Sequence, residues 1–249
     1  MSDISEDLLS KAVIRINSVV LGCTCLTGDQ VTALCGEIVK NSQLKLQSLD
    51  ISCIDVFKVP DEILAKAVCK LQYIEMSYTE ITNEQAAVLF REMIQAGETL
   101  SLETLKIESI GWATAIDNIL FANALCNLVN VDFNYGFLTN DEIECVCETV
   151  ANFPKLKIQY LNVEGMNLSG VSPGVLMNAF KRIPITRISA EKLNSNQLDE
   201  LIDILENVGE TKLQKLVVIL PVGASRFDWR SRFKKVEAKV KLEEFKFKL

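Results

Sequence analysis

Cysteines are the residues of this chain most able to bind a metal or form a covalent link, because its 249 residues include eight cysteines and no histidine. Two pairs, Cys23-Thr-Cys25 and Cys145-Val-Cys147, have the composition of two halves of a four-thiolate zinc site. The lack of histidine removes the commonest general base and the commonest metal ligand. The sequence also contains no phosphate-binding loop, dinucleotide fingerprint or nucleophile elbow. Whether the thiols can meet depends on the elements that carry them.

One helical pattern occurs four times, and each copy begins with a capping signal. The copies are "LTGDQVTALCGEIV" from Leu26, "ITNEQAAVLFREMI" from Ile81, "LTNDEIECVCETVA" from Leu138 and "LNSNQLDELIDILE" from Leu193. Their capping boxes would be Thr27/Gln30, Thr82/Gln85, Thr139/Glu142 and Asn194/Gln197. Apolar residues then recur at i, i+3, i+4 and i+7, so the pattern predicts four amphipathic helices, each with one buried stripe.

A second, shorter helical pattern alternates with the first. Its copies are "ISEDLLSKAVIR" from Ile4, "VPDEILAKAVCK" from Val59, "IDNILFANALCN" from Ile116 and "VSPGVLMNAFKR" from Val171, with starts 55, 57 and 55 residues apart. Each copy has an alanine at the same place: Ala12, Ala67, Ala124 and Ala179. A small residue kept at one helical position predicts close approach to a neighbouring backbone.

Between successive helices lies a short run with apolar residues at relative positions 1, 4, 6 and 11. The runs begin at Ile16, Leu46, Leu71, Leu102, Leu128, Ile158, Ile183, Leu213 and Leu242. The seventh run has Thr186 where leucine is expected, and the last two lack a clean eleventh position. This is the pattern L-x-x-L-x-L-x-x-x-x-L, a strand followed by a helix. Because one such unit cannot bury its apolar side alone, stacked neighbours would share a continuous core, with parallel strands on a curved inner wall.

With these nine matches and helices of alternating length, the chain resembles the ribonuclease-inhibitor-like subfamily of leucine-rich-repeat proteins over roughly residues 4 to 225. The resemblance implies an α/β horseshoe solenoid with about nine parallel concave strands and convex helices. We expect a single domain over residues 1–249: an N-terminal half-repeat (1–15), repeats (16–225) and a C-terminal cap (226–249).

The chain departs from the family pattern at relative position 9, where the family usually has Asn or Cys. Here that position holds Thr24, Ile54, Thr79, Ile110, Gly136, Met166 and Glu191. The ladder of side chains that usually satisfies backbone groups at the turn after each strand must therefore be replaced, at least in part.

The repeat decides which cysteines can meet. The two Cys-x-Cys pairs are four strands apart, roughly 20 Å at ~4.8 Å per strand, and Cys145 and Cys147 point to different sides of a helix. We therefore expect no metal site, and we expect Cys35 and Cys147 to be small apolar core residues.

Cys23 and Cys53 differ from the other cysteines because both fall at relative position 8 of adjacent strands. Their Cα atoms should lie about 5 Å apart, within the range of a disulfide. In a reducing cytosol we expect free thiols, and oxidation is the alternative.

The inner wall would display the side chains at relative positions 2, 3, 5, 7 and 8. All four tyrosines fall there, Tyr73 and Tyr160 at position 3 and Tyr78 and Tyr135 at position 8. Strands two to six also place one basic residue, Lys106, among six acidic ones: Asp50, Glu75, Glu103, Glu108, Asp132 and Glu164. The alternative interpretations are a solvated acidic face, and tyrosines that only close their own repeat.

Tyrosines among carboxylates are typical of an interface for a basic protein surface. We therefore expect a non-catalytic recognition module that binds a partner protein. The expected contact residues are Tyr73, Tyr78, Tyr135, Tyr160, Asp50, Glu75, Glu108, Asp132, Asn134 and Glu164. The family resemblance implies the same mode, because ribonuclease-inhibitor-like proteins bind targets along this face. Two alternatives stay open: a regulator of enzyme activity such as a GTPase activator, and a sensor segment of a larger assembly.

Composition bounds the other properties. The net charge of −7 argues against nucleic-acid binding, and apolar runs such as "LVVILPV" from Leu216 are too short to span a membrane. The N-terminus lacks the apolar core of a signal peptide, so we expect a cytoplasmic monomer without cofactors. The basic segment from Arg226 is interpreted as a cap, because lysines on a terminal strand prevent edge-to-edge pairing, and a phosphate or nucleic-acid patch is its alternative.

Overall fold

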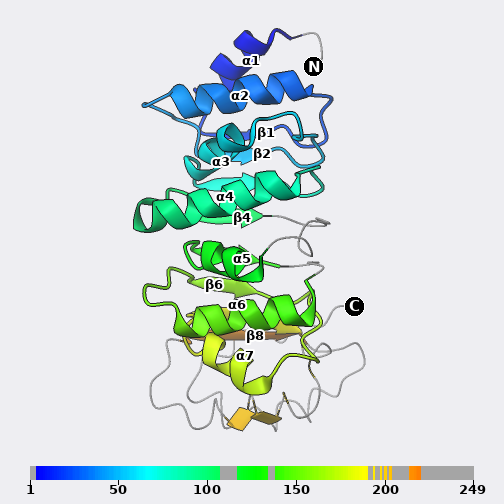
Figure 1. Ribbon diagram of the computed structural model, residues 1–249, viewed down its shortest axis with the longest axis vertical. Coiled ribbons are helices and arrows are strands. Elements are labelled where there is room, and N and C mark those ends of the chain that lie inside the picture. The colour runs from blue at the N-terminus through cyan, green and yellow to red at the C-terminus, as the bar shows by residue number, and fades with distance from the viewer. Residues whose placement is uncertain are drawn as a thin grey trace. The chain divides into compact units, whose positions relative to one another are not determined.

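A computed structural model describes residues 4–106, 117–133 and 138–189, with residues 193, 197, 199–200, 202–203 and 213–219. The chain divides into two compact units, residues 1–130 and 131–249, and each is described by itself. Helices and strands alternate along both (Figure 1). The expectation of a single domain over 1–249 stays a prediction.

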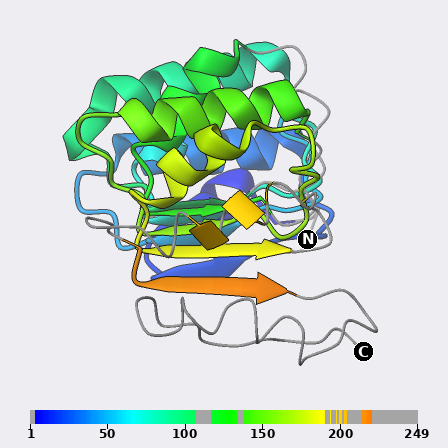
Figure 2. The ribbon, with the colours of Figure 1, turned by 90° about the horizontal axis from the view of Figure 1, so that it is seen from below.

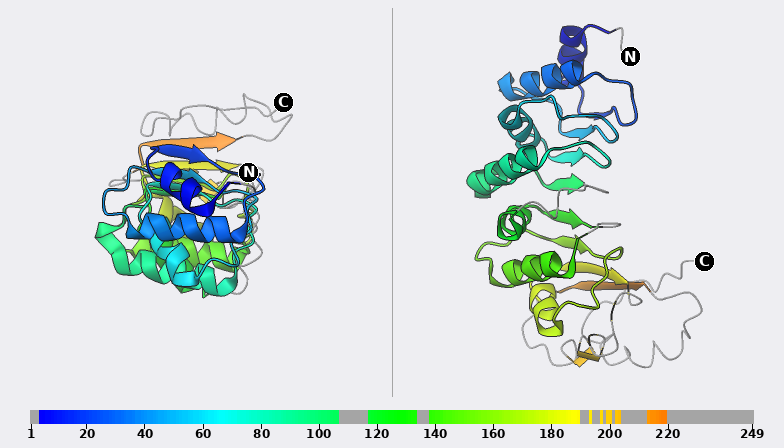
Figure 3. Two further views of the ribbon diagram at one scale, coloured as in Figure 1. Left: turned by 90° about the horizontal axis from the view of Figure 1, so that it is seen from above. Right: turned by 45° about the vertical axis from the view of Figure 1, so that its right-hand side comes forward.

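The first unit contains parallel strands that pair in chain order. Its helices are α1 (Glu6–Val13), α2 (Gly28–Lys40), α3 (Asp61–Cys69), α4 (Asn83–Ala96), the 3-10 turn η1 (Gly97–Thr99) and α5 (Asn118–Leu125). Its strands are β1 (Ser18–Val20), β2 (Ser48–Asp50), β3 (Tyr73–Glu75) and β4 (Thr104–Lys106). One row of the register joins Ser18, Ser48, Tyr73 and Thr104. The helices α1 to α4 lie on one side of these strands (Figure 3).

The second unit repeats this arrangement. Its helices are α6 (Asn140–Asn152) and α7 (Pro173–Phe180), and its strands are β6 (Tyr160–Asn162), β7 (Ile185–Ser189) and β8 (Lys215–Ile219). Strand β6 pairs with β7, and β7 with β8, in parallel, while α6 and α7 lie on one side of them (Figure 2). Strand β5 (Asn130–Asp132) spans the division between the units.

The described part of the chain thus has eight of the nine expected strands. The ninth, from Leu242, and the basic segment from Arg226 lie outside the described residues.

Capping boxes begin the three long helices α2, α4 and α6, as predicted. The hydroxyls of Thr27, Thr82 and Thr139 each accept from the backbone N–H three residues on, and the side chain there accepts from the threonine N–H. These reciprocal bonds satisfy two backbone donors at the helix start. The fourth box, at Asn194, lies outside the described residues.

The core runs between helices and strands within each unit. The middle residue of strands β2 to β4 is buried in each case: Leu49, Ile74 and Leu105. Ala67, Ala124 and Ala179 are also buried, as expected for close approach, since α3, α5 and α7 each pack on the preceding long helix. Ala12 is the exception: it is exposed, because the described residues place no helix before α1.

Glutamine side chains link successive repeats. Besides closing its capping box, Gln85 donates from Nε2 to the carbonyls of Val56 and Val59, at 2.9 and 2.8 Å. Gln197 does the same to Leu168 and Val171 (both 2.6 Å), and Gln30 to Ile4 (2.9 Å). Within the turn itself, the hydroxyls of Thr24 and Thr79 at position 9 donate to the carbonyl three residues before, each at 2.6 Å.

Basic side chains close the carboxyl ends of two long helices from the following repeat. Lys70 donates from Nζ to the carbonyls of Ile38, Val39 and Asn41 at the end of α2. Arg182, at the aligned position, donates to the carbonyls of Val150 and Ala151 at the end of α6, at 2.8 and 3.0 Å. A cation there satisfies orphan carbonyls and complements the helix dipole.

Helix α4 ends with a glycine, and the following repeat has an asparagine in place of the basic residue that closes α2 and α6. The helix stops at Gly97, which adopts φ +50° and donates from its N–H to the Met93 carbonyl. The residue aligned with Lys70 and Arg182 is here Asn127, whose amide bonds within its own segment, to the Asn123 carbonyl at 2.9 Å.

Candidate functional site

The candidate site lies on the sheet face of the first unit opposite the helices. In strands β2 to β4 the middle residue is buried and the two flanking residues are half-buried, so the flanking side chains share that opposite face. We call this set the first strand face: Ser18, Val20, Ser48, Asp50, Tyr73, Glu75, Thr104 and Lys106. It contains three of the predicted contact residues.

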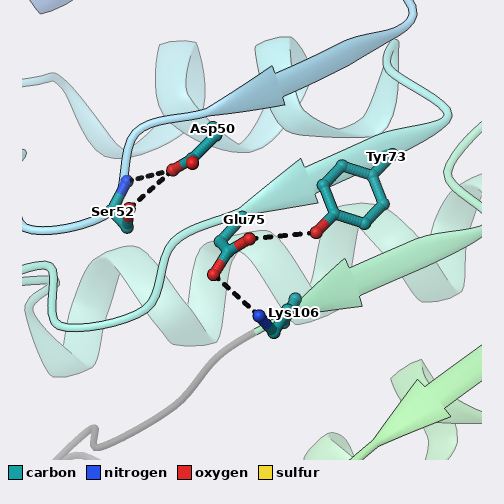
Figure 4. A network of polar contacts seen from close by, with 5 residues as sticks. All are labelled: Asp50, Ser52, Tyr73, Glu75 and Lys106. Atoms are coloured by element: carbon teal, nitrogen blue, oxygen red, sulfur yellow. Dashed lines mark hydrogen bonds and ion pairs between the residues drawn. The ribbon is translucent and has the colours of Figure 1, made fainter. Parts of the chain in front are cut away.

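A polar network fixes the centre of the first strand face. The Tyr73 hydroxyl donates to Glu75 Oε2 at 3.0 Å, and Lys106 Nζ donates to Glu75 Oε1 at 2.9 Å (Figure 4). Both oxygens of Glu75 are therefore engaged, and the Tyr73 ring is held at a defined orientation. The expected acidic character is moderated here, because Lys106 neutralises Glu75.

Asp50 is fixed by its own turn at the next position along the face. Its Oδ1 accepts from the Ser52 backbone N–H at 2.8 Å and from the Ser52 hydroxyl at 2.6 Å (Figure 4). The neighbouring repeat has Gly22 against this turn, and a Cβ there would lie 2.3 Å from Ser52 Oγ and 2.7 Å from Asp50 Oδ1. Any larger residue at this position would therefore displace the side chains of Ser52 and Asp50 from the positions that they hold here.

Tyr78 lies in the turn after β3, and 56% of it is exposed. Its backbone has φ +58°, and Cys23 and Cys53, at the same repeat position, have φ +56° and +58°. This left-handed conformation is uncommon outside glycine. Three successive repeats therefore project the side chain at position 8 from the same kind of turn.

Tyr73 is expected to ionise about two pH units later than an unfolded tyrosine. Burial first, then the hydrogen bond and negative charge of Glu75, raises the pKa of Tyr73 to about 12, from about 10 when unfolded. Because the folded protein holds the Tyr73 proton more tightly than the unfolded chain does, the protonated hydroxyl stabilises the fold. This stabilisation is complete below pH about 10 and is lost as the pH rises through about 12. Ultraviolet titration of tyrosinate should show a last step that Tyr73→Phe removes; matching curves for the two proteins would contradict the assignment.

The second unit has its own set of polar contacts on the corresponding face. Asn162 donates from Nδ2 to Asp132 Oδ1 at 2.9 Å, and Arg187 donates from Nε to Glu164 Oε2 at 2.6 Å. The Glu164 side chain is only 7% exposed, which differs from the exposed position expected for it. Partial burial alone would lower the pKa of Arg187, but the hydrogen bond and charge of Glu164 raise it.

The structure brings the predicted residues together in two groups, one in each unit. Asp50, Tyr73 and Glu75 share the first strand face, with Tyr78 in the turn beside it. The second unit holds Asp132, the half-buried Tyr160, and Glu164. Tyr135, Asn134 and Glu108 lie outside the described residues.

Sequence reasoning missed the pairing of Lys106 with Glu75 and of Arg187 with Glu164. A signal for the first existed, because both residues occupy relative position 5 of consecutive repeats and the strand register sets them side by side. Opposite charges directly across a strand pair stabilise the sheet.

The cysteines of the two Cys-x-Cys pairs form no metal site among the described residues, where no cluster of three or more Cys, Asp or Glu side chains could hold an ion. Cys35 and Cys147 are buried, as predicted, and burial raises the pKa of each to about 12. Both thiols therefore stay protonated and act as apolar core residues. In the described part of the chain, every helix is too short or too polar to cross a membrane.

Comparison with known proteins supports the fold. No protein-family description and no curated protein matches the sequence. Among solved structures, the chain is similar to the leucine-rich repeat-containing protein LegL7 from Legionella pneumophila, with 13% sequence identity and a TM-score of 0.51. The match covers 96% of this chain and 88% of LegL7. Together with the repeated strand–helix units, this likeness shows that the chain has the leucine-rich-repeat solenoid fold.

Proposed function

We propose that this chain is a non-catalytic protein-recognition module, similar to the ribonuclease-inhibitor-like subfamily, that acts as a cytoplasmic monomer. Its partner is a protein with a basic surface, and the first strand face with Tyr78 is its principal contact. The observation that carries the proposal is the Tyr73 ring, fixed by Glu75 beside Asp50. The other predicted contact residues, Glu108 in the first unit and Asp132, Asn134, Tyr135, Tyr160 and Glu164 in the second, remain secondary candidates, and the burial of Glu164 makes it the weakest of them.

A fixed tyrosine is suited to binding because less conformational entropy is lost when a partner covers it. Tyrosine also offers a large apolar ring with a polar end, which is why it is enriched in interface centres. Tyr73 is half-buried before any partner binds, and the same unit also exposes the apolar side chain of Val20 on β1 and the ring of Tyr78 in the turn after β3.

The charges on this face specify the kind of partner. Asp50 accepts hydrogen bonds from the backbone N–H and the hydroxyl of Ser52, and neither of these neutral groups cancels the charge of the carboxylate. Glu75 already holds one cation, Lys106, at 2.9 Å with the pair partly exposed. A lysine or arginine of a partner would meet the same carboxylates, and such charges steer encounter and set specificity.

The test compares the proteins captured by immobilised wild type with those captured by three variants. Tyr73→Ala removes the central ring, and Lys106→Met removes the internal cation that competes for Glu75. Ile119→Ala is the matched control, because Ile119 is 63% exposed on helix α5. Captured proteins from a lysate of the source cells are quantified by mass spectrometry, and each variant's melting temperature is measured to confirm folding.

The expected result is a set of basic proteins that Tyr73→Ala loses, Ile119→Ala retains and Lys106→Met binds more strongly. Their capture should weaken as ionic strength rises to about 0.15 M, where the Debye length falls to about 8 Å. Equal capture by wild type and Tyr73→Ala, or stronger capture at higher salt, would refute recognition through this face.

A further inference from the structure

We propose that Cys23 and Cys53 form a reversible oxidation site, in which a low-molecular-weight disulfide such as oxidised glutathione converts the two thiols into an intramolecular disulfide. The two Sγ atoms lie 3.2 Å apart in a hydrogen bond, although the residues are 30 positions apart in sequence. Both cysteines are free and exposed. This site is independent of the proposed recognition function.

The backbone holds the two thiols side by side. Cys23 donates its N–H to the Ser52 carbonyl at 2.8 Å, and Cys53 donates to the Ser77 carbonyl at 2.9 Å. Both cysteines have the same left-handed backbone conformation, at φ +56° and +58°, on turns that follow paired parallel strands. Matching turns in register project the two side chains in parallel. The repeated turn geometry therefore explains why the two thiols lie close together.

The sulfur atoms of Cys23 and Cys53 need to move only a short distance to form a bond. A disulfide bond is about 2.05 Å long, so the sulfurs must move together by about 1 Å. Both side chains are exposed, and rotation about their χ angles supplies this movement without a shift of the strands. A small oxidant can also reach both sulfurs from solvent.

The reaction proceeds by thiol–disulfide exchange in two steps. The thiolate of Cys23 attacks one sulfur of oxidised glutathione, which forms a mixed disulfide and releases one glutathione thiolate that takes up a proton. The thiolate of Cys53 then attacks the Cys23 sulfur and releases the second glutathione. The protein loses two electrons and two protons, and the small disulfide gains both.

The surroundings of Cys53 disfavour its thiolate form. The hydrogen bond with Cys23 first, then partial desolvation and the negative charges of Cys23, Asp50 and Glu75, raises the pKa of Cys53. The second step accelerates as the pH rises toward the pKa of Cys53.

The other cysteines provide internal controls. Cys25 is exposed and two residues from Cys23, whereas Cys35 is buried. Cleavage after lysine and arginine places Cys23, Cys25 and Cys35 in one peptide, residues 16–40, and Cys53 in another, residues 46–58. A link between these peptides, located by fragmentation, identifies the bonded pair.

The experiment treats the reduced full-length chain with oxidised glutathione, blocks the remaining thiols and maps the peptides by mass spectrometry. Wild type and Cys25→Ser should give the Cys23–Cys53 link, reversed by dithiothreitol, in at least tenfold excess over glutathione adducts. Cys53→Ser should stop at a stable glutathione adduct on Cys23. Stable adducts in wild type, a Cys23–Cys25 link, or unreacted Cys23 and Cys53 would each overturn the proposal.

A second measurement needs no variant. Phenylarsine oxide binds two neighbouring thiols together, and a dithiol removes it far better than a monothiol. Wild-type protein should bind one arsenical across peptides 16–40 and 46–58, and this binding should protect Cys23 and Cys53 from alkylation. Failure to protect both residues would refute the pairing even if a serine variant misfolds.

Discussion

Gln85→Leu is expected to lower the free energy of unfolding by about 3 kcal/mol, because Gln85 satisfies groups in two repeats from a fully buried position. Its Oε1 accepts from the Thr82 N–H at 2.9 Å, and its Nε2 donates to the carbonyls of Val56 and Val59. Leucine keeps most of the volume but removes every one of these bonds, and each buried polar group left unsatisfied costs about 1–3 kcal/mol. Urea denaturation followed by circular dichroism measures the change.

Two companion variants separate the roles of Gln85. Gln95→Leu, on an exposed position of the same helix, should change stability by less than about 0.5 kcal/mol. Gln85→Glu keeps the cap acceptor, as Glu142 does in α6, but turns a carboxylate toward two carbonyls. It should destabilise at neutral pH and recover as acid protonates the new side chain. Wild-type stability of Gln85→Glu at neutral pH would show that the inter-repeat bonds contribute little.

Phe90→Ala is expected to cost about 4 kcal/mol, within the range of about 3–5 kcal/mol for a buried phenylalanine. Phe90 is fully buried on α4, and its ring lies 5.3 Å from that of Phe121 on α5, tilted by 55°. The alanine variant loses apolar burial and leaves a cavity between the two helices. The midpoint of denaturant unfolding reports the loss.

The matched control is Ile94→Ala, one helical turn further along α4, where the side chain is 38% exposed. It should cost less than about 1 kcal/mol, since much of its surface already meets water. In a double-mutant cycle, Phe90 and Phe121 should couple by about 1 kcal/mol. A coupling near zero would mean that the two rings contribute separately to the core.

The helices and strands could be predicted because their signals are local. The boxes at Thr27, Thr82 and Thr139 need only a hydroxyl and an acceptor three residues apart, and the structure contains all three. Burial of Ala67 against its neighbour followed from the repeat, whereas the exposure of Ala12 depends on which helix lies beside it.

The contacts within the candidate site were less predictable because they join different repeats. Residue types and spacing placed Tyr73 and Glu75 on one face, but the Lys106 ion pair needs the register of adjacent strands and a side-chain rotamer. Similarly, no local pattern distinguishes Lys70, which caps the preceding helix, from a solvated lysine. Glu164 was expected to meet solvent, but it is buried and paired with Arg187 of the next strand.

The placement of Lys70 and Arg182 has a consequence for cooperativity. The last carbonyls of helices α2 and α6 each accept hydrogen bonds from a basic side chain of the following repeat. Fraying at the end of α3 or α7 would therefore also weaken the last turn of α2 or α6, respectively. Local unfolding of one repeat would in this way destabilise the repeat before it in the chain. Helix α4 ends at its own Gly97, so its last turn does not depend on a side chain of the following repeat in this way.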